Sequence, residues 1–184
     1  MRYFTLCVTL VLTLFLVSCA NSKDVDRLAY QSSALYVDAT FILGDESVPV
    51  TMNIGAAEYA EDGRMLARDA TLVFGENSII SGVCFEFSAG RAYVSSGEFK
   101  IPIEDTAVIS GISDMISLFC ISGEHYYSSE KLKQNGLKCE KSVYVNGENS
   151  VEVTLDLSCM LPTDIVANID GRTISAHINM IKAE

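Results

Sequence analysis

From residue 33 onward, apolar and polar residues mostly alternate, which is the pattern of strands with one buried and one wet face. The clearest alternating runs lie at residues 35–43, 48–54, 66–74, 83–87, 151–157 and 172–182. Glycine, asparagine and aspartate separate many of these runs and are typical of tight antiparallel turns. The sequence therefore predicts a meander of about eight to ten antiparallel strands.

One segment interrupts the alternation. Over residues 106–120, apolar residues recur at three- and four-residue spacing, which predicts a helix. A short helical turn is also expected at Ser129–Gln134, and Leu161-Pro162 is expected to end a strand. A sheet of this length must curl, and a helix in its concave side would cover its apolar face. The predicted fold class is mainly β (α+β), a curved antiparallel sheet or half-barrel with an inserted apolar helix.

The N-terminus has the features of a secretory signal peptide. Arg2 supplies a positive start, and residues 4–17 form an apolar centre. This centre is shorter than the roughly 20 residues of a membrane-spanning helix. The polar residues 21–24 follow at once. We therefore expect the N-terminal segment to be removed during export.

Leu16-Val17-Ser18-Cys19 resembles a bacterial lipobox. The resemblance implies cleavage before Cys19 and attachment of a diacylglycerol, with acyl chains such as palmitate, to its thiol; two chains anchor a protein stably where one does not. An ordinary signal peptide with a chance cysteine is the alternative. The expected organisation is a signal peptide at 1–18, a lipidated tether at 19–32 and one domain at 33–184.

The lipobox also implies a location. The anchored protein would lie on the outer face of the bacterial cell membrane, or on the outer membrane in a host with two membranes. Ala20 follows the expected lipidated cysteine, so the aspartate of the enterobacterial inner-membrane retention signal is absent from that position.

The order of strands and helix resembles the LolA/LolB-like half-barrel lipoprotein carriers and related uncharacterised lipoproteins. The resemblance covers most of residues 33–182 and is closest over 155–181, where a strand, Leu-Pro and a hairpin with Asp-Gly follow one another. It implies a half-open barrel, a helical lid over an apolar cavity, and binding of acyl chains or another hydrophobic ligand. The soluble carriers of that system are not lipidated, whereas this chain is expected to be.

Apolar positions on the strands and on the helix are the candidate ligand-lining residues. They are Val83, Phe85, Phe87, Val108, Ile112, Ile116, Phe119, Leu155 and Leu157. The same positions would also form a closed core, and the pattern does not separate a filled barrel from a hollow one. The predicted function is therefore non-catalytic binding or transfer of a hydrophobic ligand, with helix 106–120 as a gate. The alternative is a structural or protein-interaction lipoprotein with a closed core, docking along a strand edge.

The charge composition limits the classes of partner that the protein can bind. The formal net charge of the chain is -11, from 13 basic and 24 acidic residues. Nucleic acids and anionic headgroups attract clusters of Lys and Arg, so this balance argues against both as partners. The expected partners are a membrane, through the Cys19 anchor, and a lipid or other hydrophobic ligand.

Residues with catalytic or metal-binding chemistry are few. Glu124 and His125 follow Cys120, but zinc sites use paired ligands at short spacing and no second pair exists. His177 falls on the outward face of the last strand, and no hydrolase elbow or phosphate-binding glycine pattern is present. We therefore predict no enzymatic activity, no metal and no cofactor.

Four cysteines remain in the expected domain, namely Cys84, Cys120, Cys139 and Cys159. An even number in an exported chain permits two disulfides, with three possible pairings. Free cysteine also behaves as a small buried hydrophobe. Both interpretations remain open, and no pairing is predicted.

Overall fold

The computed structural model describes residues 26–183 except 62–65, 67, 77–80, 90, 97, 98 and 105. In this part of the chain, one α-helix, α2 (Thr106–Ser117), and two short 3-10 helices, η1 (Ala29–Ser32) and η2 (Gly123–His125), accompany a single sheet. Its strands are β1 (Leu35–Leu43), β2 (Glu46–Ile54), β3 (Ala70–Phe74), β4 (Cys84–Ser88), β5 (Arg91–Ser96), β6 (Phe99–Pro102), β7 (Tyr126–Gln134), β8 (Leu137–Asn146), β9 (Asn149–Asp156), β10 (Leu161–Ile169) and β11 (Arg172–Ala183).

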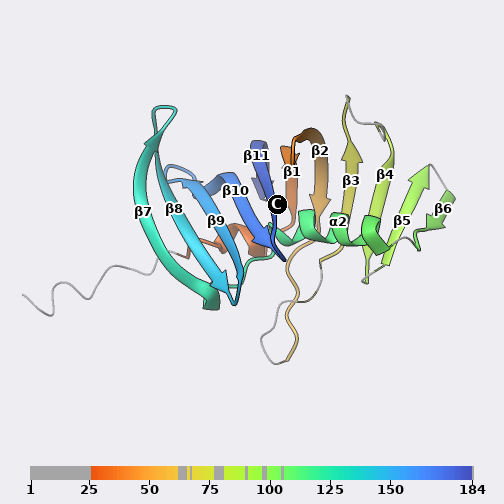
Figure 1. Cartoon of the computed structure of the whole chain (residues 1–184), viewed down its shortest axis with the longest axis horizontal. Coiled ribbons are helices and arrows are strands. Elements are labelled where there is room, and N and C mark those ends of the chain that lie inside the picture. Colours follow the sequence, from red (N-terminus) through yellow and green to blue (C-terminus); the bar gives the residue numbers. More distant parts are fainter. Residues whose placement is uncertain are drawn as a thin grey trace, which may run out of the picture.

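The sheet is antiparallel throughout, in the order β6-β5-β4-β3-β2-β1-β11-β10-β9-β8-β7. The first and last strands of the chain thus meet in the middle, and β6 and β7 form the two edges (Figure 1). The chain leaves the sheet at one edge and returns at the other. The connection that carries α2 must therefore travel across the sheet, and Figure 1 shows α2 running across the strands.

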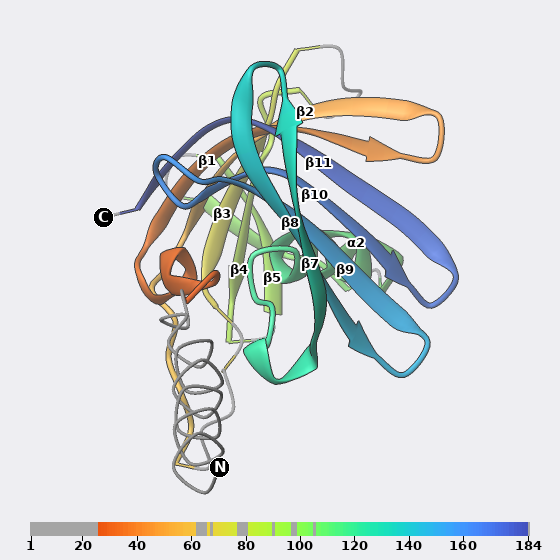
Figure 2. The ribbon, with the colours of Figure 1, turned by 90° about the vertical axis from the view of Figure 1, so that its left-hand side faces the viewer.

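The pleat sends alternate side chains to opposite faces of the sheet. Val37 pairs with Met52, Met52 with Leu72, and Leu72 with Phe85, so one apolar row runs across four strands. These four side chains are buried in one cluster with the apolar side of α2. The sheet curls around this helix, and its concave face holds the core (Figure 2).

The fold class predicted from the sequence is confirmed. The protein is mainly β, and its curved open sheet with an inserted helix is the expected half-barrel. The described residues form eleven strands where eight to ten were expected. The helix begins at Thr106 as predicted and ends at Ser117, after which Leu118 and Phe119 form a turn.

The helical turn predicted at Ser129–Gln134 is wrong. This segment belongs to β7, which pairs with β8 along its length. The hairpin turn between them is Asn135-Gly136, with φ of 50° and 85°, the left-handed values that favour these two residues. Because β7 is an edge strand with most of its side chains exposed, its sequence lacks the alternation that identifies a half-buried strand.

The strand end expected at Leu161-Pro162 is also wrong. β9 already ends at Asp156, and Leu161-Pro162 begins β10. The register between β9 and β10 shifts between Pro162 and Asp164, which accommodates a proline within a paired strand. Leu157 consequently lies in the turn after β9 and not on its inward face.

Part of the segment expected as a tether lies against the sheet. Tyr30 and Gln31 of η1 are buried, and the Arg27 guanidinium forms an ion pair with Glu140 of β8. Arg27 also lies over the ring of Tyr126, 5.3 Å from its centroid. Tyr30 and Gln31 are therefore part of the buried interior, while Cys19 and the predicted signal peptide lie outside the described residues.

Candidate ligand-binding site

Six of the nine predicted lining residues are buried in the apolar cluster that α2 and the concave face of the sheet share. Ile112, Ile116 and Phe119 project from the helix and the turn after it, and Phe85, Phe87 and Leu155 project from the strands. Each of the six side chains is buried, and all belong to the same apolar cluster. They therefore line the contact between α2 and the sheet, and this contact is filled by their own side chains.

The other three predicted lining residues lie at the margins. Val83 is half-buried just before β4, and Leu157 is half-buried in the turn after β9. Val108 lies in the first turn of α2 and is 39% exposed. The burial of α2 thus increases along its length, from an exposed first turn to a buried C-terminal half.

The C-terminal end of α2 is fixed by Arg68, a buried arginine whose guanidinium binds three backbone carbonyls. It donates to Gly55 after β2 at 2.6 Å, to Ser33 before β1 at 2.7 Å, and to Phe119 after α2 at 3.1 Å. Three segments far apart in the sequence are thereby held together. Arg68 lies in the alternating run at residues 66–74, but its role depends on backbone groups that a sequence pattern does not locate.

Gln31 provides a second attachment at the same end. Its carbonyl oxygen accepts a hydrogen bond from the Ile121 N–H at 2.7 Å, and its amide donates to the Ile121 carbonyl at 3.4 Å. Gln31 is 2% exposed, so both bonds lie away from water, where an unmade hydrogen bond is costly. The chain after α2 is therefore clamped from two sides.

Burial governs the electrostatics around this end of the helix. It lowers the pKa of Arg68, yet an arginine starts so high that the guanidinium stays charged. Burial likewise raises the pKa of the neighbouring Cys120 thiol, so the sulfur is neutral at pH 7. A neutral thiol is a poor nucleophile, and Cys120 acts as part of the core.

The sheet extends beyond the exposed end of α2. Ile101 of β6 pairs with Val94 of β5, which pairs with Phe85, so Ile101 continues the apolar row on the concave face. Ile101 is 65% exposed, and Phe99, two residues earlier on the same face, is 78% exposed. The concave face therefore ends in uncovered apolar side chains at the β6 edge.

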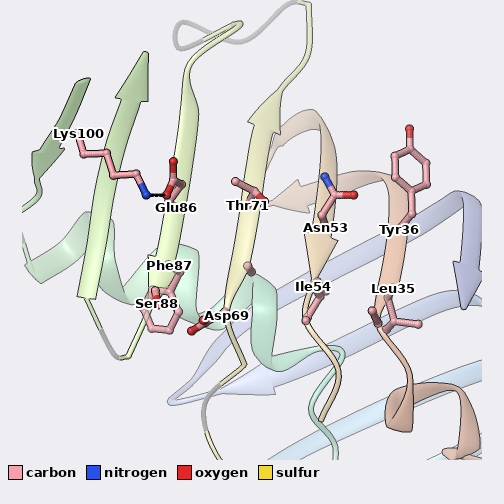
Figure 3. Close-up of a pocket in the computed structure, with 13 residues that line it drawn as sticks. Leu35, Tyr36, Asn53, Ile54, Asp69, Thr71, Glu86, Phe87, Ser88 and Lys100 are labelled. Carbon is pink, nitrogen blue, oxygen red and sulfur yellow. Dashed lines mark hydrogen bonds and ion pairs between the residues drawn. The ribbon is translucent and has the colours of Figure 1, made fainter. Parts of the chain in front are cut away.

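The structure also contains a pocket, which lies outside the contact between α2 and the sheet. A pocket of about 430 Å³ lies over β1 to β4 and is lined by Ala34, Leu35, Tyr36, Asn53, Ile54, Gly55, Asp69, Ala70, Thr71, Glu86, Phe87, Ser88 and Lys100. Figure 3 shows Lys100 reaching from the edge strand to Glu86, with which it forms an ion pair. Of the nine predicted lining residues, Phe87 alone borders this pocket. The pattern of apolar and polar residues does not indicate the pocket.

The histidines and cysteines form no metal centre within the described residues, where no group of three His, Cys, Asp or Glu side chains is placed to hold an ion. His177 is exposed, as predicted, and its Nδ1 lies 2.7 Å from Asp164 Oδ1. Cys84, Cys120, Cys139 and Cys159 are free thiols in the structure, with Cys139 buried and Cys159 exposed.

Across the part of the chain that the structure describes, no helix has both the length and the apolar character needed to cross a membrane.

Neither a protein-family model nor a curated protein matches the chain. Among solved structures, it is similar to the MucA/MucB complex of Pseudomonas aeruginosa, with a TM-score of 0.43 and 12% identity over 85% of this chain and 54% of the matched one. It is also similar to LprF from Mycobacterium bovis, with a TM-score of 0.45 and 10% identity over 86% and 90% of the two chains.

A third similar structure is NE2245 from Nitrosomonas europaea, a LolA superfamily protein, with a TM-score of 0.37 and 10% identity over 84% and 87% of the two chains. This chain spans about half the length of the MucB chains that it matches. These similarities concern the backbone and assign no ligand or partner to this chain.

Proposed function

We propose that the protein binds a hydrophobic ligand, an acyl chain of a lipid, between α2 and the concave face of the sheet, and that it does so without catalysis. One observation carries this proposal. In the part of the chain that the structure describes, one α-helix covers the apolar face of an open half-barrel, and that face continues past the helix to the exposed side chains of Phe99 and Ile101.

The contacts of α2 support a hinged movement. Its C-terminal end is held by buried hydrogen bonds to Arg68 and Gln31. Further along, the Asp114 carboxylate pairs with Arg172 at 3.0 Å, a partly exposed contact that costs little to break. Because the first turn is the most exposed, the helix would lift from that end, next to β6, and swing about its C-terminal end.

The ligand would then replace contacts that the closed core makes with itself. Lifting α2 exposes the apolar side chains of Ile112, Met115 and Ile116, which costs about 25 cal/mol per Å² of surface. An acyl chain that packs against the same side chains covers this surface again and recovers the free energy of its burial. A closed unliganded state and an open liganded state would thus have similar free energies.

The resemblance of residues 16–19 to a lipobox supports a membrane location for this activity. We propose that Cys19 anchors the protein outside the cytoplasm, so that residues 20–25 link the lipid to the sheet. Replacing Cys19 with serine removes the sulfur that the acyl-glyceryl group needs. The C19S variant should appear in the soluble extracytoplasmic fraction, whereas a variant that stays with the membrane would contradict the anchor.

The ligand is tested on residues 20–184, purified without detergent. Native mass spectrometry should show a mass above that of the denatured chain by the mass of a lipid. After delipidation, the fluorescent fatty acid cis-parinaric acid should bind saturably. Protein that carries no extra mass and binds no cis-parinaric acid would overturn the proposal.

A matched pair of variants locates the ligand. Ile116→Trp adds a ring between helix and sheet. Overpacking of this kind typically lowers the stability of a folded protein by about 1–3 kcal/mol. Val73→Trp adds the same ring at a side chain that is 39% exposed. Circular dichroism first establishes that both variants are folded. Binding should weaken at least tenfold in Ile116→Trp and remain unchanged in Val73→Trp; equal binding by the two would place the probe elsewhere.

The second candidate function is a protein-interaction lipoprotein with a closed core. It is favoured by the burial of Ile112, Ile116 and Phe119 and by the exposed apolar residues of edge strand β6, to which a partner could add a strand. In that case Ile101→Lys should abolish capture of a partner by the anchored protein, and the native and denatured masses should be equal.

A further inference from the structure

We propose that the pocket on the convex face of the sheet, opposite α2, is a second binding site and that it takes an uncharged saccharide. The pocket has a volume of about 430 Å³ and is lined by residues of β1, β2, β3, β4 and β6. Ligand pockets commonly have volumes of about 300–1,000 Å³, so one or two sugar rings fit.

The register of the strands explains why this part of a sheet surface is hollow. Tyr36 lies opposite Asn53, Asn53 opposite Thr71, and Thr71 opposite Glu86, so one polar row crosses four strands on the convex face. The next row toward the strand ends contains small residues, including Ala34 and Gly55. The surface is therefore lower beyond the first row, whose side chains Figure 3 labels.

Gly55 lies at the bottom of the pocket and has no side chain to fill it. A Cβ built at Gly55 would meet the Asp69 carbonyl oxygen at 3.4 Å, an ordinary van der Waals contact, so the backbone tolerates a larger residue there. The space above the glycine is thus open to a ligand. On the far side, the Lys100 side chain crosses from β6 to Glu86 and closes the pocket toward the sheet edge.

The polar groups that line the pocket are mixed in kind. The carboxylates of Asp69 and Glu86 accept hydrogen bonds, the Lys100 ammonium donates, and the Asn53 amide and the Thr71 hydroxyl do both. A hydrogen bond from Lys100 lowers the pKa of Glu86, which keeps that carboxylate ionised at neutral pH. Sugar hydroxyls, which both donate and accept, match such a set.

The same groups disfavour other ligand classes. An anion would meet the carboxylates of Asp69 and Glu86. A metal ion would meet the Lys100 ammonium, and no set of three ligating side chains exists among the described residues. An acyl chain would leave the Asn53 amide and the Thr71 hydroxyl without water or a partner, which is unfavourable. A neutral polar molecule remains.

Tyr36 supplies the aromatic surface on which sugar rings stack. Its neighbour on β11 is Lys182, whose Nζ lies 5.7 Å from the Tyr36 ring centroid, and its neighbour on β2 is Asn53 in the pocket. Tyr36 is half-buried, and we expect the ring face that Lys182 does not cover to pack against the apolar C–H face of a sugar.

The site is tested on the full-length chain in dodecylphosphocholine micelles, a detergent without a sugar headgroup. The probes are methyl glucoside, methyl galactoside, N-acetylglucosamine, maltose and cellobiose, observed by saturation-transfer difference NMR. At least one should bind saturably, with a dissociation constant on the order of 1 mM for so open a site. No saturable signal from any of the five at 20 mM would overturn the proposal.

Two variants on the same face of β2 locate the sugar. Asn53→Ala removes the amide from the pocket, and Thr51→Ala shortens the residue two positions away that does not line it. Asn53→Ala should weaken binding at least fivefold, with Thr51→Ala unchanged; equal binding by both variants would overturn the assignment. Because the site lies opposite α2, Ile116→Trp should leave sugar binding intact, so failure of one proposal is distinguishable from failure of the other.

Discussion

Tyr30 is buried with its hydroxyl group and has no hydrogen-bond partner for that group among the described residues. Burial raises the pKa of Tyr30 well above its usual value, because an ionised phenolate would lose its hydration. Because it is buried without a partner in the described part of the chain, the hydroxyl lowers the stability of the folded state at neutral pH. It also couples folding to alkaline pH.

The sign of this coupling follows from linkage. A tyrosine in the unfolded chain releases its proton near pH 10, whereas Tyr30 in the folded protein keeps it. Stability is therefore fully present below about pH 10 and is lost above it, by up to about 1.4 kcal/mol per pH unit. Tyr30→Phe removes this group, so its free energy of unfolding should fall less steeply between pH 10 and 11.

Urea unfolding at several pH values measures the effect. At pH 7, the free energy of unfolding of Tyr30→Phe should equal that of the wild type or exceed it by up to about 1 kcal/mol, because the substitution removes an unpaired buried hydroxyl. Tyr127→Phe is the control. Because Tyr127 is 74% exposed, this substitution should change neither the stability at pH 7 nor its fall at alkaline pH. A Tyr30→Phe variant that loses 2 kcal/mol or more at pH 7 would show that the hydroxyl has a partner.

At the scale of the element, the C-terminal end of α2 is held by Arg68. Arg68→Met keeps an unbranched side chain but deprives the carbonyls of Ser33, Gly55 and Phe119 of their donor. An unsatisfied buried polar group costs about 1–3 kcal/mol, and water can reach part of this cluster. The free energy of unfolding should fall by about 2–4 kcal/mol.

Hydrogen exchange distinguishes a loosened helix from general destabilisation. In Arg68→Met, the amides of Phe119 and Cys120 should exchange faster by a larger factor than those of β9 on the other half of the sheet. Arg91→Met, at an exposed arginine of β5, should change stability by less than about 0.5 kcal/mol. Uniform acceleration across the sheet would contradict a local role for Arg68.

The elements that the sequence predicted are those with a buried and an exposed face. β1, β2 and β9 alternate because the core selects every second residue, and α2 has its apolar stripe for the same reason. β7 has no such stripe, because water covers most of its residues. The Asn135-Gly136 turn was the local signal that could have identified it.

The candidate site was predictable only in part. Ile116, Phe119 and Phe85 meet because each faces the core, which periodicity reveals. Whether the space between them is open depends on side-chain volumes and on the tilt of α2, and periodicity contains neither. The convex pocket depends on Lys100 of β6 reaching Glu86 of β4, a contact set by tertiary geometry alone.

For the whole molecule, the sheet consists of two meanders joined at one seam. β1 to β6 and β7 to β11 each pair neighbour with neighbour, whereas β1 and β11 come from opposite ends of the domain. Closing that pair costs more chain entropy than closing any hairpin. The local hairpins should consequently form first and the seam last.

Two buried substitutions test this order. Phe41 of β1 pairs with Ala176 of β11 in the seam, whereas Val153 of β9 lies within the second meander beside Ser142 of β8. Phe41→Leu and Val153→Ala should each cost about 1–3 kcal/mol, enough to interpret kinetically. In stopped-flow experiments, Phe41→Leu should act more on the unfolding rate than Val153→Ala does. Phe41 pairs with Val48 of β2 in an early hairpin, but its contacts with β11 form after the transition state.

Val153→Ala should instead slow folding, with at least half of its loss of stability appearing in the folding rate. The comparison is informative because both side chains are fully buried, so burial alone predicts no difference between them. If Phe41→Leu slows folding as much as Val153→Ala does, the seam belongs to the folding nucleus. The first and last strands would then pair early, and the two meanders would grow outward from the centre of the sheet toward the edges that α2 connects.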